Sequence, residues 1–392
     1  MQKKIENLFS VIVAITPALA VYSFLPGLSL AFFLVWLCFI PLFFVCSDKN
    51  FNYDEVVFLF CICFISIISF LYHTVVGVEW FDSVLFYHNM FGIMVCLIPL
   101  CFVTKYINTK VFVNAMFFWG IVASVILIWQ WLSLFFWGSF QNDVFIPGLK
   151  VNRDLETFSL FRPSAFFTEP AHFSIYMLPV FQIALSQKRI VLTCLFAISI
   201  LFSGSSTGFV LMFVLLVYRL YWEGRKKWYM LFFGMAALPL IVFVANVVIP
   251  EVFLNNFDKL YAVTEGKSDN RLLGPLAYFP LLQSYEYVFG ITLNQLANLM
   301  SMNGSFGYAV NYANAAIYMF ISFGAFGFVT LVAYIVMKFR ATQDSYAFLL
   351  IFIGIVCSDQ ILFNGNYFYL VVLVLMSNKI NAYRKEIELK KA

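Results

Sequence analysis

Long apolar segments separated by short charged breaks recur along the whole chain, and this pattern constrains the fold more than any other feature. A helix that crosses a bilayer needs about 20 mostly apolar residues. Because the apolar runs are continuous rather than alternating, they favour helices over barrel strands. The sequence therefore predicts an all-α polytopic membrane helix bundle of about twelve transmembrane helices, in a single integral membrane domain over residues 1–392. The predicted spans lie near residues 7–25, 27–46, 55–72, 85–104, 111–136, 171–186, 190–203, 206–221, 229–249, 313–337, 345–361 and 365–377.

The composition excludes the soluble alternatives. Hydrophobic residues make up 63% of the chain and charged residues 11%, whereas soluble domains average about 45–50% and about 25%. The mean hydropathy is +0.90. Too few polar residues exist to cover a water-soluble globule or to keep a chain disordered in water. The net charge of +4 is too weak to indicate a dense basic face, so no nucleic-acid partner is expected.

The distribution of lysine and arginine predicts the orientation in the membrane. With the N-terminus in the cytoplasm, eighteen of the 24 basic residues lie on the cytoplasmic side, and the C-terminus is cytoplasmic as well. Two loops on the opposite side are long, at 137–170 and 250–312, and long loops are commonly functional. Residues 272–289 in the second loop are apolar but interrupted by Pro275 and Pro280, which predicts short interfacial helices.

The segment RPSAFFTEPAHF, residues 162–173, combines the side chains most useful for chemistry. Pro170 suits the first position of a helix, which would place Glu169 at the cap and His172 in the first turn, on a shared face. Arg162 lies seven residues upstream. A helix N-terminus favours anions, so this grouping suits a phosphorylated substrate and a proton transfer. Taken singly, each of these residues also has an ordinary structural explanation.

Four further polar residues are candidates for a site. Asp269 and Arg271, in the second long loop, could meet an anionic group or form a solvated ion pair. Ser205, in the turn SGSST, could offer its hydroxyl to a phosphate or belong to a simple turn between helices. Asp359 lies near the outer end of the eleventh span, where it could line a cavity or cap a helix pair.

The segment from Arg162 to His172 resembles the arginine-led loop and Glu-Pro helix start of Wzy-type O-antigen polymerases. The layout of many spans, two large periplasmic loops and an arginine in each loop is similar too. The turn at 203–208 is similar to the family's serine-rich turn, although many relatives carry a basic residue about where Ser206 stands. The resemblance covers the architecture of the full chain and short motifs at residue level.

This resemblance implies a GT-C-like glycosyltransferase architecture in a bacterial inner membrane and a role in lipopolysaccharide biosynthesis. The implied substrates are oligosaccharide repeat units on undecaprenyl pyrophosphate, which the family joins by moving the growing glycan from one lipid carrier to the sugar end of another. It implies no metal and no cofactor. A polysaccharide chain-length regulator and a flippase are the implied protein partners.

The reaction assigns roles to the candidate residues. Breaking the sugar–phosphate bond builds negative charge on the pyrophosphate, and without a metal guanidinium groups must stabilise it. Arg162 and Arg271 are the expected pyrophosphate-binding residues. Glu169 is the first choice for the base that receives the proton of the attacking hydroxyl, and His172 is the second. Ser205, Asp269 and Asp359 are expected to line the cavity.

Two other functions stay open at this point. An O-antigen ligase, which transfers glycan to the lipid A–core, would share the fold and differ in the acceptor. A lipid-linked oligosaccharide flippase would also have about twelve spans, but it would place charges in a central cavity and often show internal repeats. The polar residues of this chain gather in outer loops instead, which favours an enzyme.

Overall fold

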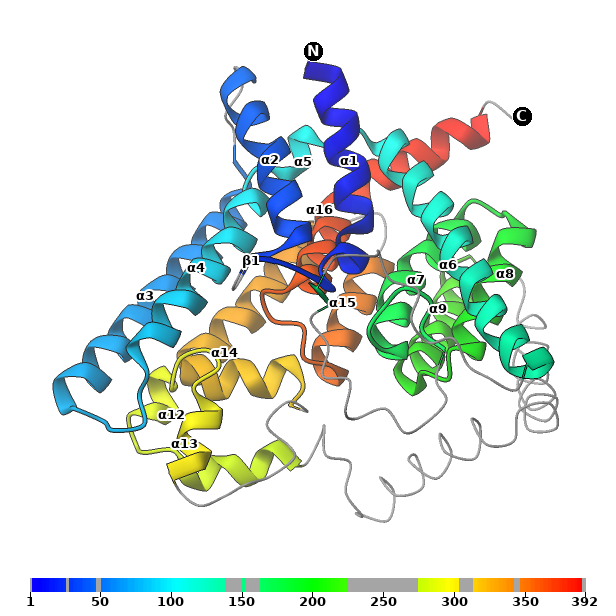
Figure 1. Ribbon diagram of the computed structural model, residues 1–392. Coiled ribbons are helices and arrows are strands. Elements are labelled where there is room, and N and C mark those ends of the chain that lie inside the picture. The colour runs from blue at the N-terminus through cyan, green and yellow to red at the C-terminus, as the bar shows by residue number, and fades with distance from the viewer. Residues whose placement is uncertain are drawn as a thin grey trace. The chain divides into compact units, whose positions relative to one another are not determined.

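The computed structural model describes residues 2–25, 28–46, 51–137, 150–151, 163–223, 274–302, 313–341 and 346–389. This part of the chain is almost entirely helical, with very little sheet (Figure 1). Four of its helices are long and apolar enough to cross a membrane, namely Tyr53–Val76, Ser83–Leu100, Thr109–Ser133 and Ala315–Arg340. The all-α fold predicted from the apolar runs is therefore present, with helices of membrane-spanning length.

The helix boundaries follow the predicted segments closely. Each predicted span coincides with a helix, apart from 229–249, which lies outside the described residues. The longer helices are α1 (Gln2–Leu19), α2 (Leu30–Val45), α3 (Tyr53–Val76), α4 (Ser83–Leu100), α6 (Thr109–Trp137), α7 (Pro170–Ser186), α8 (Ile190–Phe202), α9 (Ser206–Glu223), α14 (Ala315–Ala341), α15 (Ala347–Ser358) and α16 (Gly365–Leu389). Short elements are α5 (Val103–Tyr106), the 3-10 helix η2 (Gly274–Leu281), α12 (Glu286–Phe289) and α13 (Leu296–Met302).

The chain divides into two compact units. The first comprises residues 1–116, 147–152 and 270–392, and the second comprises residues 117–146 and 153–269. In the first unit α1 packs on α2 and α16, while α3 packs on α4 and α14. In the second unit α7 packs on α8 and α9.

A small sheet in the first unit corrects the predicted end of the first span. The prediction continued this helix to Leu25, but α1 ends at Leu19 and residues 22–25 form strand β1 (Tyr22–Leu25). Strand β1 pairs antiparallel with β2 (Leu28–Ser29) and with β3 (Lys150–Val151), in the order β2-β1-β3. Proline and glycine at 26–27 are turn-forming residue types, a local signal that the prediction of one continuous apolar helix to Leu25 did not use.

Helix α14 is broken near its middle. Gly324 has φ 65° and ψ −166°, which is not helical. The carbonyl groups of Ile321 and Ser322, just before the break, accept hydrogen bonds from the backbone N–H groups of Ile291 (3.1 Å) and Thr292 (2.8 Å). Backbone carbonyls that are freed in an apolar setting need such partners. The segment that follows α12 is therefore bound to the break in α14.

Side chains of α6 hold the loop and the turn of the second unit in place. The carboxamide of Gln130 accepts from the backbone N–H of Ala165 (2.9 Å) and donates to its carbonyl (3.1 Å). The indole N–H of Trp131 donates to the carbonyl of Phe202 at 2.9 Å. These bonds fix the residues before α7 and the residues before α9 against the same helix.

Candidate functional site

The predicted site residues fall in different parts of the molecule. Arg162, Asp269 and Arg271 lie outside the described residues. Glu169, His172 and Ser205 belong to the second unit, whereas Asp359 belongs to the first.

Helix α7 begins at Pro170, as the sequence predicts. Glu169 is the N-cap residue with an extended backbone (φ −141°, ψ 153°), and its side chain makes no capping hydrogen bond. Nδ1 of His172 lies 2.7 Å from the hydroxyl of Thr168. When that nitrogen carries the proton and donates to Thr168, Nε2 keeps a free lone pair and can act as a base. A carboxylate and an imidazole thus lie half-buried at the positive end of a helix dipole.

The serine-rich turn packs against the same helix. Ser205 is 7% exposed, and its hydroxyl accepts the backbone N–H of Gly208 at 3.1 Å, which caps α9. The hydroxyl of Ser203 lies 3.3 Å from that of Ser174 in α7. A Cβ atom at Gly208 would lie 2.3 Å from the Ser174 oxygen, so the approach of the two helices needs a glycine there. The structure therefore brings this turn to the first two turns of α7, and it uses the Ser205 hydroxyl as a cap.

Asp359 links two helices of the first unit. It ends α15, and its backbone carbonyl accepts the N–H of Ala315 at the start of α14 (2.9 Å). Its carboxylate accepts the N–H of Gln360, also at 2.9 Å. Asp359 is not among the residues that line the cavity described next, so its observed contacts are those of a residue that joins helix ends.

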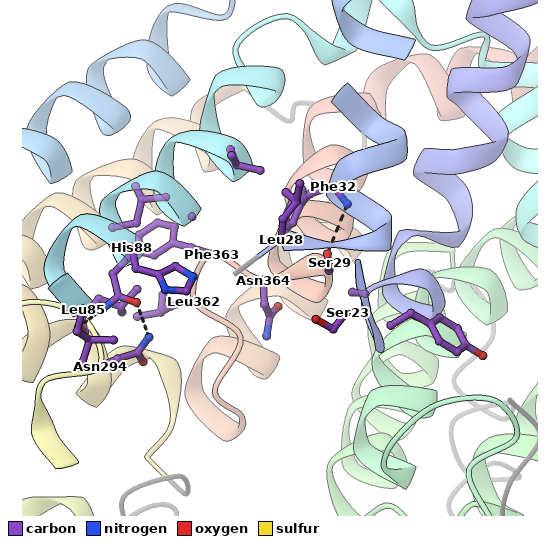
Figure 2. A pocket seen from close by; sticks show the side chains of 18 residues that line it. Ser23, Leu28, Ser29, Phe32, Leu85, His88, Asn294, Leu362, Phe363 and Asn364 are labelled. Atoms are coloured by element: carbon purple, nitrogen blue, oxygen red, sulfur yellow. Dashed lines mark hydrogen bonds between the residues drawn. The ribbon is translucent and has the colours of Figure 1, made fainter. Parts of the chain in front are cut away.

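A cavity of about 450 Å³ opens in the first unit (Figure 2). Its described walls come from residues 20–23 and 28–32, from 85–95 of α4, from 293–294 and from 362–365. Small-molecule sites typically measure about 300–1,000 Å³, so this cavity is large enough for one small ligand. The polar lining side chains include Ser23, Ser29, His88, Asn89, Asn294 and Asn364.

Two asparagines from distant segments form a hydrogen-bonded pair on the cavity wall. Asn294 donates its side-chain N–H to the Asn89 oxygen at 2.8 Å, and Asn89 donates to the carbonyl of Leu293 at 2.7 Å. The hydroxyl of Tyr318 donates to the Asn294 oxygen at 2.8 Å and accepts the Asn294 backbone N–H at 3.0 Å. Figure 2 shows Asn294 near His88, with Ser23 and Asn364 further along the cavity. The pair is therefore fixed in position from both sides.

The residues of the cavity wall that the structure describes carry no acidic side chain, lysine or arginine. His88 is exposed and makes no hydrogen bond or ion pair with the described part of the chain, so both of its ring nitrogens are available to a ligand. Gly92, one turn further along α4, has open space where a Cβ atom would be.

The backbone next to the cavity is strained. Asn294 (φ 61°) and Phe363 (φ 57°) line the cavity in the left-handed region, and Thr292 (φ 66°) lies two residues before Asn294. Such conformations cost about 1–3 kcal/mol each and cluster at functional sites. Asparagine tolerates this region better than most residues. At Asn294 this backbone conformation is held by the two hydrogen bonds with Tyr318.

The sequence does not predict this cavity or a role for the residues that line it. Asn89 lies in a predicted span, where an asparagine is explained by hydrogen bonding between helices. Asn294 lies in no recognisable motif. Their side chains meet across 205 positions of sequence, which no spacing rule predicts. The available signal was weak: His88 and Asn89 are polar residues near the end of an apolar run that the predicted topology places on the outer side.

No group of three or more His, Cys, Asp or Glu residues within the described ranges is arranged to hold a metal ion. Comparisons with protein-family models and with curated proteins find no match to this sequence.

Proposed function

We propose that this protein is an O-antigen polymerase of the Wzy type, which joins undecaprenyl-pyrophosphate-linked oligosaccharide repeat units at the periplasmic face of a bacterial inner membrane. The observation that carries the proposal is the cavity of the first unit. By the predicted topology, all four of its wall segments reach the side opposite the basic termini. A cavity at that level suits a substrate that is anchored in the outer leaflet.

Each wall segment supports this placement. Residues 20–23 and 28–32 come from the adjoining ends of the first two predicted spans, and 362–365 lie where the last two meet. Residues 85–95 lie toward the N-terminal end of α4, which the basic-residue count orients from outside to inside. Residues 293–294 belong to the second long loop. About twelve spans in a GT-C-like arrangement, with both termini cytoplasmic, form part of the proposal.

The transfer itself is a substitution at a sugar carbon. A hydroxyl oxygen of the acceptor sugar forms a bond to C1 of the donor sugar, and the bond from C1 to the phosphate oxygen breaks. The diphosphate leaves with the electron pair, and the hydroxyl proton passes to a base. Arg162 and Arg271 provide positive charge for the leaving group, and Glu169 receives the proton, with His172 as the second candidate.

The arginines give the first test. Arg162→Ala and Arg271→Ala should each abolish long polymer and leave single repeat units, because the charge on the diphosphate loses its partner. Lys259→Ala, which removes a cation from the same outer loop as Arg271, is the control and should keep polymer. Unchanged chain length in both arginine variants would show that the pyrophosphate site is elsewhere. Glu169→Gln tests the base separately, since it removes the charge and keeps the size.

The cavity gives the second test. Gly92→Leu places a side chain in open space and should fill the cavity without displacing protein atoms, so polymer should be lost while the protein accumulates normally. Phe91→Leu changes an exposed side chain on the same helix and should leave polymer unchanged. Normal polymer from Gly92→Leu would exclude the cavity as a substrate site.

The accumulated product separates the polymerase from the ligase. Deletion of a polymerase leaves one repeat unit attached to its final core, whereas deletion of a ligase leaves polymer on the lipid carrier. A flippase deletion would leave the repeat units on the cytoplasmic side.

A further inference from the structure

We infer that the cavity of the first unit binds an uncharged sugar unit, and that the Asn89–Asn294 pair selects it. The inference rests on the proposed function only in treating this sugar as part of a lipid-linked repeat unit. It assigns the cavity to sugar recognition and places the diphosphate elsewhere.

The uncharged lining formed by the described residues indicates the class of ligand. A carboxylate or phosphate that enters the cavity loses hydration, and none of the described lining residues offers a guanidinium or ammonium group in return. An acidic sugar or a diphosphate is therefore disfavoured. A ligand with many hydroxyl groups loses less free energy on entering the cavity, because the amides and hydroxyls of the wall can replace its hydrogen bonds to water.

The asparagine pair has unused hydrogen-bonding capacity. Each carboxamide has two N–H groups, and each uses one of them within the protein: Asn89 toward Leu293 and Asn294 toward Asn89. One N–H group on each residue is left for a ligand. Asn294 is exposed and Asn89 is half-buried, so both can be reached. Adjacent sugar hydroxyls accept and donate at a spacing that two neighbouring amides can match.

Other wall residues complete a sugar site. The hydroxyl of Ser29 accepts the backbone N–H of Phe32 at 3.4 Å, which leaves its own proton available. His88 can donate or accept. Phe32 and Phe363 offer apolar surface for the C–H face of a sugar ring. Because Tyr318 and the left-handed backbone fix Asn294, binding needs little reordering of the wall.

The ligand class can be tested with the full chain in lipid nanodiscs. Saturation-transfer NMR is measured with methyl glycosides of glucose, galactose and N-acetylglucosamine, and with the matching methyl uronides. We expect saturation of the ring protons of at least one neutral glycoside. Its uronide should bind about tenfold more weakly, because its carboxylate loses one interaction with water that the wall does not replace. Equal binding of a neutral glycoside and its uronide would overturn the inference, as would saturation of the aglycone methyl alone.

Variants locate the binding. Asn294→Gly keeps the left-handed backbone and removes the amide, and it should weaken binding about tenfold, as should Asn89→Ala. Gly92→Leu should abolish binding. Asn298→Ala changes an asparagine that bonds to Gln295 outside the cavity and should bind like the wild type. Thermal unfolding of each variant confirms that it is folded.

The outcomes separate the inference from the proposed function. If a neutral glycoside binds to the wild type and this binding is abolished in Gly92→Leu, the inference is supported. If the wild-type protein nevertheless makes no polymer, the polymerase proposal is refuted. The inference is refuted if no glycoside binds to the wild type, or if binding is unchanged in both Gly92→Leu and Asn294→Gly. If the protein still forms polymer in either case, the polymerase proposal is unaffected.

Discussion

Helix α3 is held at its two ends by polar clusters of different character. At its first turn the ammonium group of Lys338, from α14, lies 2.7 Å from a Glu55 oxygen and 3.0 Å from an Asp54 oxygen. The hydroxyl of Tyr334 donates to both Glu55 oxygens, at 3.0 and 3.1 Å. Glu55 and Lys338 are 1% and 3% exposed. This end is held by a buried pair of an acidic and a basic side chain.

The last turns of α3 are held by an imidazole, a phenol and a carboxyl group, with no lysine or arginine among the described partners. Nδ1 of His73 lies 2.7 Å from the carbonyl of Ser69, and since a carbonyl only accepts, this nitrogen carries the proton. Nε2 is then the acceptor for the hydroxyl of Tyr285. A Glu286 oxygen lies 3.3 Å from Nε2 and from the Tyr285 hydroxyl, and the other accepts the N–H of Gln283 at 2.6 Å.

The difference assigns a different task to each end. The 24 residues of α3 extend about 36 Å at about 1.5 Å each, so the clusters are far apart. The charged cluster joins two helices. The His73 cluster fixes the segment that starts at Tyr285 and continues to Asn294 on the cavity wall. By the predicted topology this second end is on the outer side, where the substrate would bind.

Removal of the Lys338 charge should have the largest effect. Lys338→Met leaves two carboxylates without a cation, one of them fully buried, and should lower the free energy of unfolding by about 3–5 kcal/mol. Denaturant unfolding of the purified protein in detergent measures it. Arg340→Met, two residues further along α14 and exposed, should change little. Equal losses in the two variants would show that burial of the ion pair is unimportant.

Gly290→Ala should have the next largest effect and should act on the other end. Gly290 accepts the Ser69 hydroxyl at 2.7 Å. A Cβ atom there would lie 2.3 Å from the Ser322 carbonyl carbon, at φ +75°. Overpacking and left-handed strain together should cost about 2–4 kcal/mol. Gly77 also has a left-handed backbone (φ +70°), but a Cβ atom there would meet no atom within 4 Å. Gly77→Ala therefore measures the backbone strain alone, which should cost about 1–2 kcal/mol. If Gly290→Ala lowers the free energy of unfolding by no more than Gly77→Ala does, overpacking at Gly290 contributes nothing.

His73→Leu should have a smaller effect. The substitution leaves the Tyr285 hydroxyl and Glu286 without their imidazole partner, which should cost about 1–3 kcal/mol. It should also weaken ligand binding in the cavity, because the segment that carries Asn294 loses an anchor. His88→Leu, at an exposed histidine without a protein partner in the described chain, should alter stability by less than about 0.5 kcal/mol. Wild-type stability of His73→Leu would show that the cluster does not hold the segment.

The smallest expected effect is a dependence on alkaline pH. Burial, and then the neighbouring Glu286 carboxylate, raise the pKa of Tyr285 above its ordinary value. The folded state therefore keeps this proton after the unfolded chain has lost it, so the stability from Tyr285 is complete below about pH 10 and declines as the pH rises further. Tyr285→Phe should show a shallower fall in melting temperature between about pH 9 and pH 11. Identical slopes would assign the decline to other groups.

The start of α7 shows what sequence could predict about the candidate site. Pro170 as the first helical residue and Glu169 as the cap are local matters of backbone dihedral angle and missing N–H groups, and the helix begins there. The contact of His172 with Thr168 was not predicted, because Thr168 lies before the helix begins and regular helical spacing does not reach it. The strands β1 and β2 were missed for the opposite reason: they lie within a stretch that hydropathy alone assigns to helices.

The sequence by itself determined that this chain forms apolar helices and where most of them begin and end, because hydropathy and helix termination are read within about 20 neighbouring residues. Only the tertiary structure decided which polar side chains meet. Asn89 finds Asn294, and His73 finds Glu286, across 205 and 213 positions. Such pairs depend on how helices pack and on a glycine that lets two backbones approach, and neither is encoded at any fixed spacing.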